Sequence, residues 1–347
     1  MPDCGMFASF HGSIGVSKQR TIGPFSVSAI GLGCMNMSMG YGPRPDLEYS
    51  GRLLNQALDA GYSFLDTAAI YGMGHNEELI GRFLSSRRDE YLLASKCGIY
   101  NNSEGRTVID GRPEVLRRTC DEALRRLNTE VIDLYYLHRP DPQVPIEESV
   151  GALARRVEAG KVQMLGLSEV SDVNLRRAHA TDPISALQSE YTLWSRTPER
   201  KVLDSCDELG IIFVPFSPLG RQFLTGKSPD ISELPEKDLR VSIASPRFMP
   251  ENFAENRKLL VPFTEIAQQH DCSPAQLALA WLLARHPGLV PIPGTRHIEY
   301  MHENLGALDV SLDAETVQAL DDLINEQTVR GARYDAERMR ISDAEKD

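Results

Sequence analysis

Several features are missing from this chain of 347 residues, and each absence narrows the class of protein. The six cysteines include no Cys-x-x-Cys pair and no zinc-type spacing, which favours reduced thiols over a disulfide framework. No apolar run approaches the length of about 18 residues that a membrane span needs. The N-terminus, MPDCGMFASFHGSIGV, is too broken by glycine and histidine to form the apolar core of a signal peptide. We therefore expect a cytoplasmic protein.

The chain also has fewer basic residues (37 Lys and Arg) than acidic residues (49 Asp and Glu). The formal net charge of −12 argues against a nucleic acid or an anionic membrane as partner. It also gives no long-range attraction to an anionic ligand, so any phosphate site must be built from local groups. A hydrophobic content of 41% and a charged content of 25% are ordinary for a globular protein with a large core.

The chain alternates strand-like runs with amphipathic helical segments from end to end. Eight strands separated by helices predict parallel pairing through right-handed crossovers, and eight is the number that closes a barrel. An open doubly wound sheet is the alternative, and the lack of a Gly-x-Gly-x-x-Gly motif after the first strand weakens it. The sequence predicts a single (β/α)8 TIM barrel over residues 28–330. Its strands are expected at Ala29–Leu32, Tyr62–Leu65, Tyr91–Ser95, Ile132–Leu137, Val162–Leu167, Ser185–Leu187, Ile211–Pro215 and Leu289–Ile292.

Three parts of the chain lie outside this repeat. We expect residues 1–27 to form a hairpin that closes the barrel bottom, with Gly23-Pro24 as its turn. Residues 224–260 form a long connection whose prolines argue against one long helix and whose length suggests a lid. Residues 331–347 are a charged tail whose last residues we expect to fray.

Four groups able to transfer protons come at or just past the carboxyl ends of consecutive expected strands. Asp66 ends one strand, Tyr71 lies on the loop that follows, and Lys96 and His138 close the next two strands. Each residue taken alone is more often a cap, a packing group or a turn residue. Four of them in consecutive strand–helix units indicate an active site built on a rigid scaffold.

Two further segments bear on ligands. The run His75–Glu78 has side chains that could bind a metal, but it is better interpreted as the start of a helix with Asn76 as its cap, so we expect no catalytic metal. Gly294 and Thr295 precede a predicted helix, where main-chain N–H groups favour an anion. Arg296 adds a planar, charged donor suited to a phosphate.

Seven segments, in the same order along the chain, resemble the aldo-keto reductase superfamily. The sequences of several are most similar to its microbial and plant branch, which includes pyridoxal reductase-like enzymes. The resemblance covers residues 25–331. The segments are LDTAAIYGMGHNEELIG, LLASKCG, IDLYYLHRPD, GKVQMLGLSEVS, LQSEYTLWSR, VPFSPLGRQFLTGK and PIPGTRHIEYMHENLGA.

The resemblance implies reduction of aldehydes or ketones to alcohols with NADPH, and more weakly with NADH. It assigns Tyr71 as general acid, Asp66 and Lys96 as its tuning pair and His138 as the residue that orients the substrate. Chemistry supports this, because a phenol with a pKa of about 10 is a poor acid at neutral pH unless a neighbouring cation stabilises its ionised form.

The cofactor contacts that we predict come partly from the resemblance and partly from the chain itself. Glycines at the end of the first strand permit close approach of a flat ring. The resemblance places the nicotinamide carboxamide near strands five and six, the nicotinamide face and pyrophosphate near strand seven, and the adenosine phosphate after strand eight. The predicted contacts are Gly33, Cys34, Met35, Asp66, Ser168, Glu169, Gln188, Phe216, Ser217, Leu219, Gly220, Arg221, Lys227, Gly294, Thr295, Arg296, Tyr300, Glu303 and Asn304.

Three other functions stay open from the sequence. The protein could be a pyridoxal reductase in the narrow sense, or a cofactor-sensing regulatory subunit with slow turnover. A barrel acting on sugar phosphates would also carry a phosphate site near its last strands, but it does not explain Tyr71 and Lys96 together. The expected partner is a small carbonyl compound, whose identity depends on the loops at 37–45, 100–112, 194–196 and 224–250. The sequence leaves the oligomeric state open.

Overall fold

A computed structural model of the chain describes residues 17–243 and 245–347. Its centre is a sheet of seven parallel strands in the order β11-β10-β9-β8-β5-β4-β3. Apart from the first, which is shifted toward Gly33, these strands match the predicted ones within a few residues. They are β3 (Leu32–Gly33), β4 (Phe64–Asp66), β5 (Leu92–Cys97), β8 (Ile132–Leu137), β9 (Val162–Ser168), β10 (Ile184–Glu190) and β11 (Ile212–Phe216).

Residues 289–294 fill the eighth position and close the barrel. This segment bridges β11 through Leu289 and Ile292 and bridges β3 through Gly294. The carbonyls of Pro291 and Pro293 accept hydrogen bonds from the N–H groups of Gly31 and Gly33. Because proline has no N–H group, Pro291 and Pro293 cannot donate hydrogen bonds to the β3 side. The hydrogen-bond ladder there is therefore incomplete, and the segment forms isolated bridges. The predicted closed barrel is confirmed, with an eighth element that is extended but only partly hydrogen-bonded.

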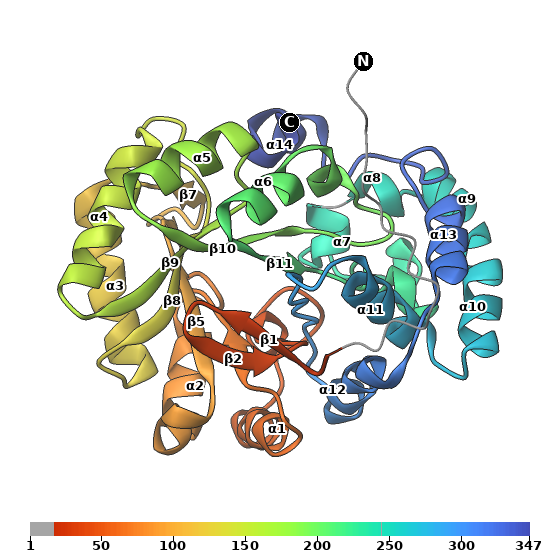
Figure 1. Cartoon of the computed structure of the whole chain (residues 1–347), viewed down its shortest axis with the longest axis horizontal. Coiled ribbons are helices and arrows are strands. Elements are labelled where there is room, and N and C mark those ends of the chain that lie inside the picture. The colour runs from red at the N-terminus through yellow and green to blue at the C-terminus, as the bar shows by residue number, and fades with distance from the viewer. Residues whose placement is uncertain (1–16, 244) are drawn as a thin grey trace.

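A hairpin closes one end of the barrel, as expected for the described part of the N-terminal region. Strands β1 (Gln19–Ile22) and β2 (Phe25–Ser28) pair antiparallel around Gly23, and they lie in front of the sheet in Figure 1. Ile22 and Val27 are buried in the same cluster as the apolar residues that point into the barrel. Gly23 packs so closely on Met164 that a Cβ atom would lie 2.3 Å from its sulfur. Residues 1–16 of the expected hairpin region lie outside the described residues.

The strands bury both faces, in two separate cores. Residues on one face point into the barrel, while their neighbours in sequence, such as Leu65, Leu93 and Leu187, pack outward against the helices. Because side chains alternate along a strand, this register fixes which polar residues can face the interior. The inward apolar layer contains Phe64, Ala94, Tyr136, Ala186, Val214 and Ile292.

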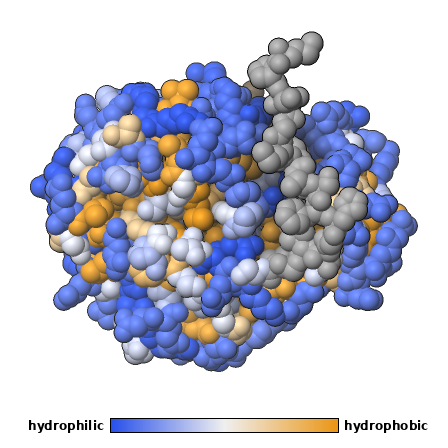
Figure 2. Space-filling model, viewed as in Figure 1, coloured by the Kyte–Doolittle hydropathy of each residue, from blue (hydrophilic) through white to orange (hydrophobic). Residues whose placement is uncertain are grey.

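Helices surround the barrel on the outside (Figure 1), and the face in Figure 2 is largely hydrophilic around its rim. No helix among the described residues is long and apolar enough to cross a membrane. A capping box from Ser273 and Gln276 starts α11, as its Ser-Pro start predicts. The helices of the barrel wall are α1 (Leu47–Asp59), α2 (His75–Leu84), α3 (Pro113–Leu127), α4 (Ile146–Glu158), α5 (Asp172–Thr181), α6 (Val202–Leu209), α11 (Pro274–Arg285), α12 (Ile298–Leu305) and α13 (Ala314–Leu323).

The long connection after β11 contains short helices, as its prolines predict. They are α7 (Leu239–Ser242), α8 (Ser245–Phe248), α9 (Pro250–Lys258) and the start of α10 (Leu260–Gln269). Edge-to-face aromatic contacts hold this segment, since Phe248 packs against Trp194 and Phe253 packs against Phe223. Its opening as a lid stays a prediction.

Two predictions about local structure are wrong. The C-terminal tail does not fray: it forms α14 (Ala336–Ile341), which lies near α5 and α6 in Figure 1, and Asp343 accepts hydrogen bonds from Ser171 and Asn174. Its charged residues have partners in the barrel, which their composition alone does not reveal. Asn76 is not a helix cap, because Gly74 takes that position; the Asn76 side chain is instead buried and bonded to Thr67 and Ser38.

Candidate active site

The catalytic candidates continue the inward register of the barrel. Two residues beyond Phe64, Ala94 and Tyr136 lie Asp66, Lys96 and His138. The same step from Ala186, Val214 and Ile292 leads to Gln188, Phe216 and Gly294. The apolar layer thus ends in a polar layer at the carboxyl ends of the strands, which is where barrel enzymes place their active sites.

Lys96 and Asp66 form a buried ion pair at the floor of this polar layer. The Lys96 ammonium donates to Asp66 Oδ1 and, over 2.8 Å, to the carbonyl of Thr67. Gln188 Nε2 donates to the other Asp66 oxygen at 2.7 Å. Burial alone would lower the pKa of Lys96, but that pKa is raised instead, with the charge of Asp66 as the largest opposing cause. The lysine therefore stays charged.

Tyr71 lies over this pair on the loop between β4 and α2. The Lys96 ammonium is 5.1 Å from the centre of the Tyr71 ring, and the His138 ring meets it edge-on with centroids 5.9 Å apart. Burial raises the pKa of Tyr71, and the charge of Lys96 only partly offsets that effect. Lys96 thus acts on this pKa in the direction expected from the sequence, but burial is the larger effect, and the phenol holds its proton at neutral pH.

His138 is neutral in this environment. Burial, together with the positive charges of Arg139 and Lys96, holds the pKa of His138 well below its usual range. A neutral imidazole has one N–H donor to offer. Tyr71 and His138 both line the cavity, one with a hydroxyl group and the other with a neutral imidazole.

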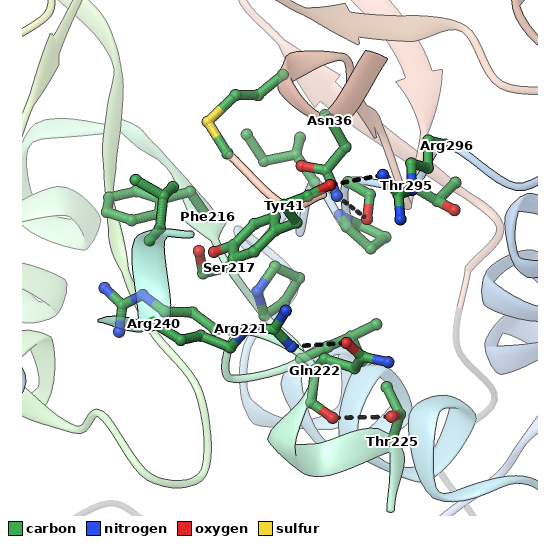
Figure 3. A pocket seen from close by; sticks show the side chains of 18 of the residues that line it. Asn36, Tyr41, Phe216, Ser217, Arg221, Gln222, Thr225, Arg240, Thr295 and Arg296 are labelled. Atoms are coloured by element: carbon green, nitrogen blue, oxygen red, sulfur yellow. Dashed lines mark hydrogen bonds between the residues drawn. The ribbon is translucent and has the colours of Figure 1, made fainter. Parts of the chain in front are cut away.

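The cavity above these residues has a volume of about 570 Å³ and contains most of the predicted site, which is within the usual range for small-molecule pockets. Figure 3 shows Asn36, Thr295 and Arg296 across an open space from Gln222 and Thr225. The predicted residues that line it are Gly33, Met35, Asp66, Tyr71, His138, Ser168, Gln188, Phe216, Ser217, Leu219, Arg221, Lys227, Gly294, Thr295, Arg296, Tyr300, Glu303 and Asn304.

The structure does not bring three predicted contacts, Cys34, Glu169 and Gly220, to the cavity. Cys34 is one residue out of register with inward-facing Gly33 and is fully buried on the helix side. Glu169 follows inward-facing Ser168 and pairs with Arg333 at 2.6 Å instead. Burial alone would raise the pKa of Glu169, but the charges of Arg333 and Arg139 outweigh burial and lower it to about 2. Gly220 packs against Trp194, with no room for a side chain.

The loop after β11 has an unusual backbone conformation. Ser217, Arg221 and Gln222 have positive φ angles of 49°, 54° and 79°, which are uncommon for residues with side chains. Such strain tends to gather at functional sites, where surrounding contacts hold it. Here the ion pair of Arg221 with buried Glu190, at 2.6 Å, fixes one side of the loop.

Several cavity residues have no counterpart among the sequence-based predictions. They come from loops and from the C-terminal segment, whose course a sequence pattern does not give. Loops 37–45 and 224–250 contribute, whereas no residue of 100–112 or 194–196 lines the cavity; residues 99–109 form the hairpin of β6 (Ile99–Asn101) and β7 (Thr107–Ile109). The residues missed include Asn36, Tyr41, Arg139, His297 and Tyr334.

Comparison with known proteins agrees with this geometry. The sequence profile of the Aldo/keto reductase family matches residues 29–325, and the chain therefore belongs to that family. It is 43% identical to an aldo-keto reductase from Schizosaccharomyces pombe whose name specifies NADP(+), over 91% of this chain and 94% of the relative. A probable aldo-keto reductase of Glycine max is 42% identical over 89% of both chains.

Solved structures show the same fold. A glycerol dehydrogenase from Gluconobacter oxydans superposes with a TM-score of 0.81 at 28% identity, over 88% of this chain and 94% of the other. An aldo/keto reductase from Klebsiella pneumoniae, solved in complex with NADP and acetate, superposes with a TM-score of 0.71 at 27% identity, over 92% and 99%.

Proposed function

We propose that this protein reduces aldehydes or ketones to alcohols with NADPH, using Tyr71 as the proton donor. The observation that carries the proposal is the register of the barrel interior. It turns Asp66, Lys96 and His138 into one polar layer beneath Tyr71. Family membership and the NADP-binding relatives support the choice of cofactor.

The residues of the site suit a nicotinamide cofactor. Phe216 offers a flat apolar face, and Ser168 and Gln188 offer polar groups nearby. At Gly33 an added Cβ would lie 2.8 Å from the carbonyl of Ile292, so only glycine keeps this wall flat. We assign Phe216, Ser168 and Gln188 to the nicotinamide end of the cofactor.

The far end of the cavity suits phosphate groups. Arg296 donates to the carbonyls of Tyr41 and Pro43, both at 2.7 Å, and has no carboxylate within 4.0 Å in the described part of the chain. Lys227 is also without a carboxylate partner among the described residues and lies 5.5 Å from the centre of the Tyr300 ring. We assign Arg296 to the ribose phosphate and Lys227 to the pyrophosphate, with Ser217, Leu219 and Arg221 alongside it and Glu303 and Asn304 at the adenine edge.

The chemistry then follows from charge. When bound, NADPH supplies a hydride to the carbonyl carbon. As negative charge develops on the carbonyl oxygen, the Tyr71 hydroxyl donates its proton to that oxygen, and the charged Lys96 stabilises the resulting phenolate. Asp66 keeps Lys96 charged and in place. The neutral His138 ring donates a hydrogen bond to the same oxygen and orients the substrate.

The experiment that tests the proposal is a survey of NADPH oxidation by the purified protein. The panel contains pyridoxal, aromatic aldehydes, methylglyoxal and steroid ketones, with product analysis for the alcohol. We expect alcohol formation in step with NADPH loss for at least one class. Tight NADPH binding without turnover of any class would favour the regulatory-subunit alternative instead. Preference for pyridoxal over all other aldehydes would support the narrower pyridoxal reductase assignment.

A further inference from the structure

The cavity contains more positive charge than the proposed cofactor sites use. Two of its cations are neutralised within the protein: Arg221 pairs with Glu190 at 2.6 Å, and Arg240 pairs with Asp238 at 2.8 Å. Arg296 and Lys227 lie at the phosphate end. Arg139 is the remaining cavity cation, and it lies at the catalytic end.

Arg139 follows His138 directly at the end of β8, so the fold fixes it beside the catalytic residues. Its Nη1 atom donates to the carbonyl of His138 at 2.6 Å and to Ser168 Oγ at 2.9 Å. These two bonds hold the side chain toward the cavity. The guanidinium carbon lies 6.0 Å from the centre of the Phe216 ring.

Among the described residues, Arg139 has no direct ion-pair partner, although its charge acts on buried Glu169. Within the described part of the chain, no carboxylate lies within 4.0 Å of it, and its Nε and Nη2 atoms donate to no protein acceptor. The side chain is half-buried, so water screens it less than it would a surface arginine. Two N–H groups in a fixed plane match the two oxygens of a carboxylate.

We propose that Arg139 is a specificity-determining residue that binds a carboxylate on the substrate, which makes carboxylate-bearing aldehydes and ketones the preferred substrate class. The inference rests on the proposed carbonyl reduction. Tyr71 and His138 hold the carbonyl oxygen, and Arg139 holds the acid group on the same side of the cavity. The apolar ring of Phe216 and the side chains of Leu239 and Ile243 form the remaining walls around the carbon skeleton.

A pair of substrates of nearly equal shape tests this assignment. The compounds 4-carboxybenzaldehyde and 4-nitrobenzaldehyde are both planar, but only the first is charged at neutral pH. For Arg139→Met we expect the KM of the carboxylate to rise by about 10- to 100-fold, as for loss of a charged hydrogen-bond partner. The KM of the nitro compound should change by less than about 3-fold on the same grounds. Arg139→Lys keeps the positive charge but loses the planar pair of N–H donors. Its KM for the carboxylate should therefore fall between those of the wild type and Arg139→Met.

Controls separate this role from two others. Arg82→Met removes the same charge from the exposed face of α2 and should leave the ratio of the two KM values unchanged. If Arg139 instead contacts the cofactor, Arg139→Met will weaken NADPH binding and affect both aldehydes equally, and the assignment is overturned. If Arg139→Met does not fold, equal KM changes for both aldehydes in Arg139→Lys overturn it as well. Failure of the wild type to reduce either aldehyde would count against the proposed function, not against Arg139 alone.

Discussion

At the scale of single residues, the site combines a buried phenol with a neutral histidine. Burial raises the pKa of Tyr71 above its ordinary value of 10, and burial with the charges of Arg139 and Lys96 holds that of His138 well below 6.5. A raised tyrosine pKa means that the proton donor is lost only when the pH rises above that value. A lowered histidine pKa means that the ring gains charge only in acid.

We therefore expect kcat/KM for carbonyl reduction to be flat from about pH 6.5 to about pH 9. The profile should be recorded with a substrate that does not itself titrate, such as 4-nitrobenzaldehyde. His138→Asn is the control, because it removes the ring. An inflection centred near pH 6.5 in the wild type that disappears in His138→Asn would show that His138 titrates normally, contrary to its buried environment.

Arg296 sets the choice of cofactor in our assignment. Arg296→Ala should weaken the binding of NADPH by about 1.5–3 kcal/mol, which is roughly a ten- to hundredfold loss of affinity. NADH serves as the internal control, since it has no ribose 2′-phosphate, while the loss of the Arg296 bonds to the Tyr41 and Pro43 carbonyls affects the site for both cofactors. Fluorescence titration measures both affinities. Equal losses for the two cofactors would place the 2′-phosphate away from Arg296.

The strand-end residues of the site could be predicted from the strand pattern, whereas most of its loop residues, such as Lys227 and Tyr300, came from the family resemblance. Asp66, Lys96, His138 and Gln188 follow from strand ends, because a strand fixes the side to which its side chains point. Cys34 and Glu169 sit one residue away from inward positions, and a motif comparison without strict register does not separate them from their neighbours. Arg139 directly follows His138 at the end of β8, so its place beside the site was readable in the sequence, whereas Tyr334 lines the cavity because of tail geometry, which no local pattern encodes.

At the scale of elements, the C-terminal segment is part of the barrel structure. Arg333 pairs with Glu169 at 2.6 Å and with Glu345 at 2.8 Å, and it is almost fully buried. The next residue, Tyr334, lines the cavity, with its ring near Arg221 and Arg333. Glu169 therefore acts as an anchor for this segment, which explains a carboxylate at that position without any contact to a cofactor.

Glu169→Gln should destabilise the protein by about 3 kcal/mol, the lower end for a broken buried pair, because Glu345 remains beside Arg333. With a folded pKa of about 2 against an ordinary 4.5, the contribution of Glu169 is present above about pH 4.5 and disappears as the pH falls toward 2. The difference from wild type in urea unfolding should therefore shrink in acid. Arg200→Gln, which breaks the exposed pair with Glu326, is the control and should cost less than about 1 kcal/mol. Equal effects of the two changes would contradict the anchoring role.

The elements themselves were largely predictable, except where partners distant in sequence decide. Alternating apolar runs identified the strands, and Ser273-Pro274 identified the start of α11. The last strand is reduced to isolated bridges because Pro291 and Pro293 lack N–H groups. Both prolines were visible in the sequence. The order of the tail depends on Glu169 and Ser171, more than 150 residues away from it, and composition alone therefore suggested disorder.

At the scale of the whole molecule, one closed barrel aligns every strand end on a single face. The hairpin and its neighbours Phe64 and Met164 fill the other end of the interior, and the cavity opens over the polar layer at the carboxyl end. This arrangement makes Tyr71 the central element of the account: it is held over Lys96, protonated, and directed at the cavity.

The most direct test of the account is a comparison of Tyr71→Phe with the wild type in two assays. NADPH affinity, measured by fluorescence titration, should be nearly unchanged, because the ring and its packing against His138 remain. Carbonyl reduction should fall by about 10²- to 10⁴-fold, the usual cost of losing general acid catalysis. A variant that binds NADPH normally and keeps more than about half of the wild-type activity would show that another group donates the proton, and would contradict the proposed mechanism.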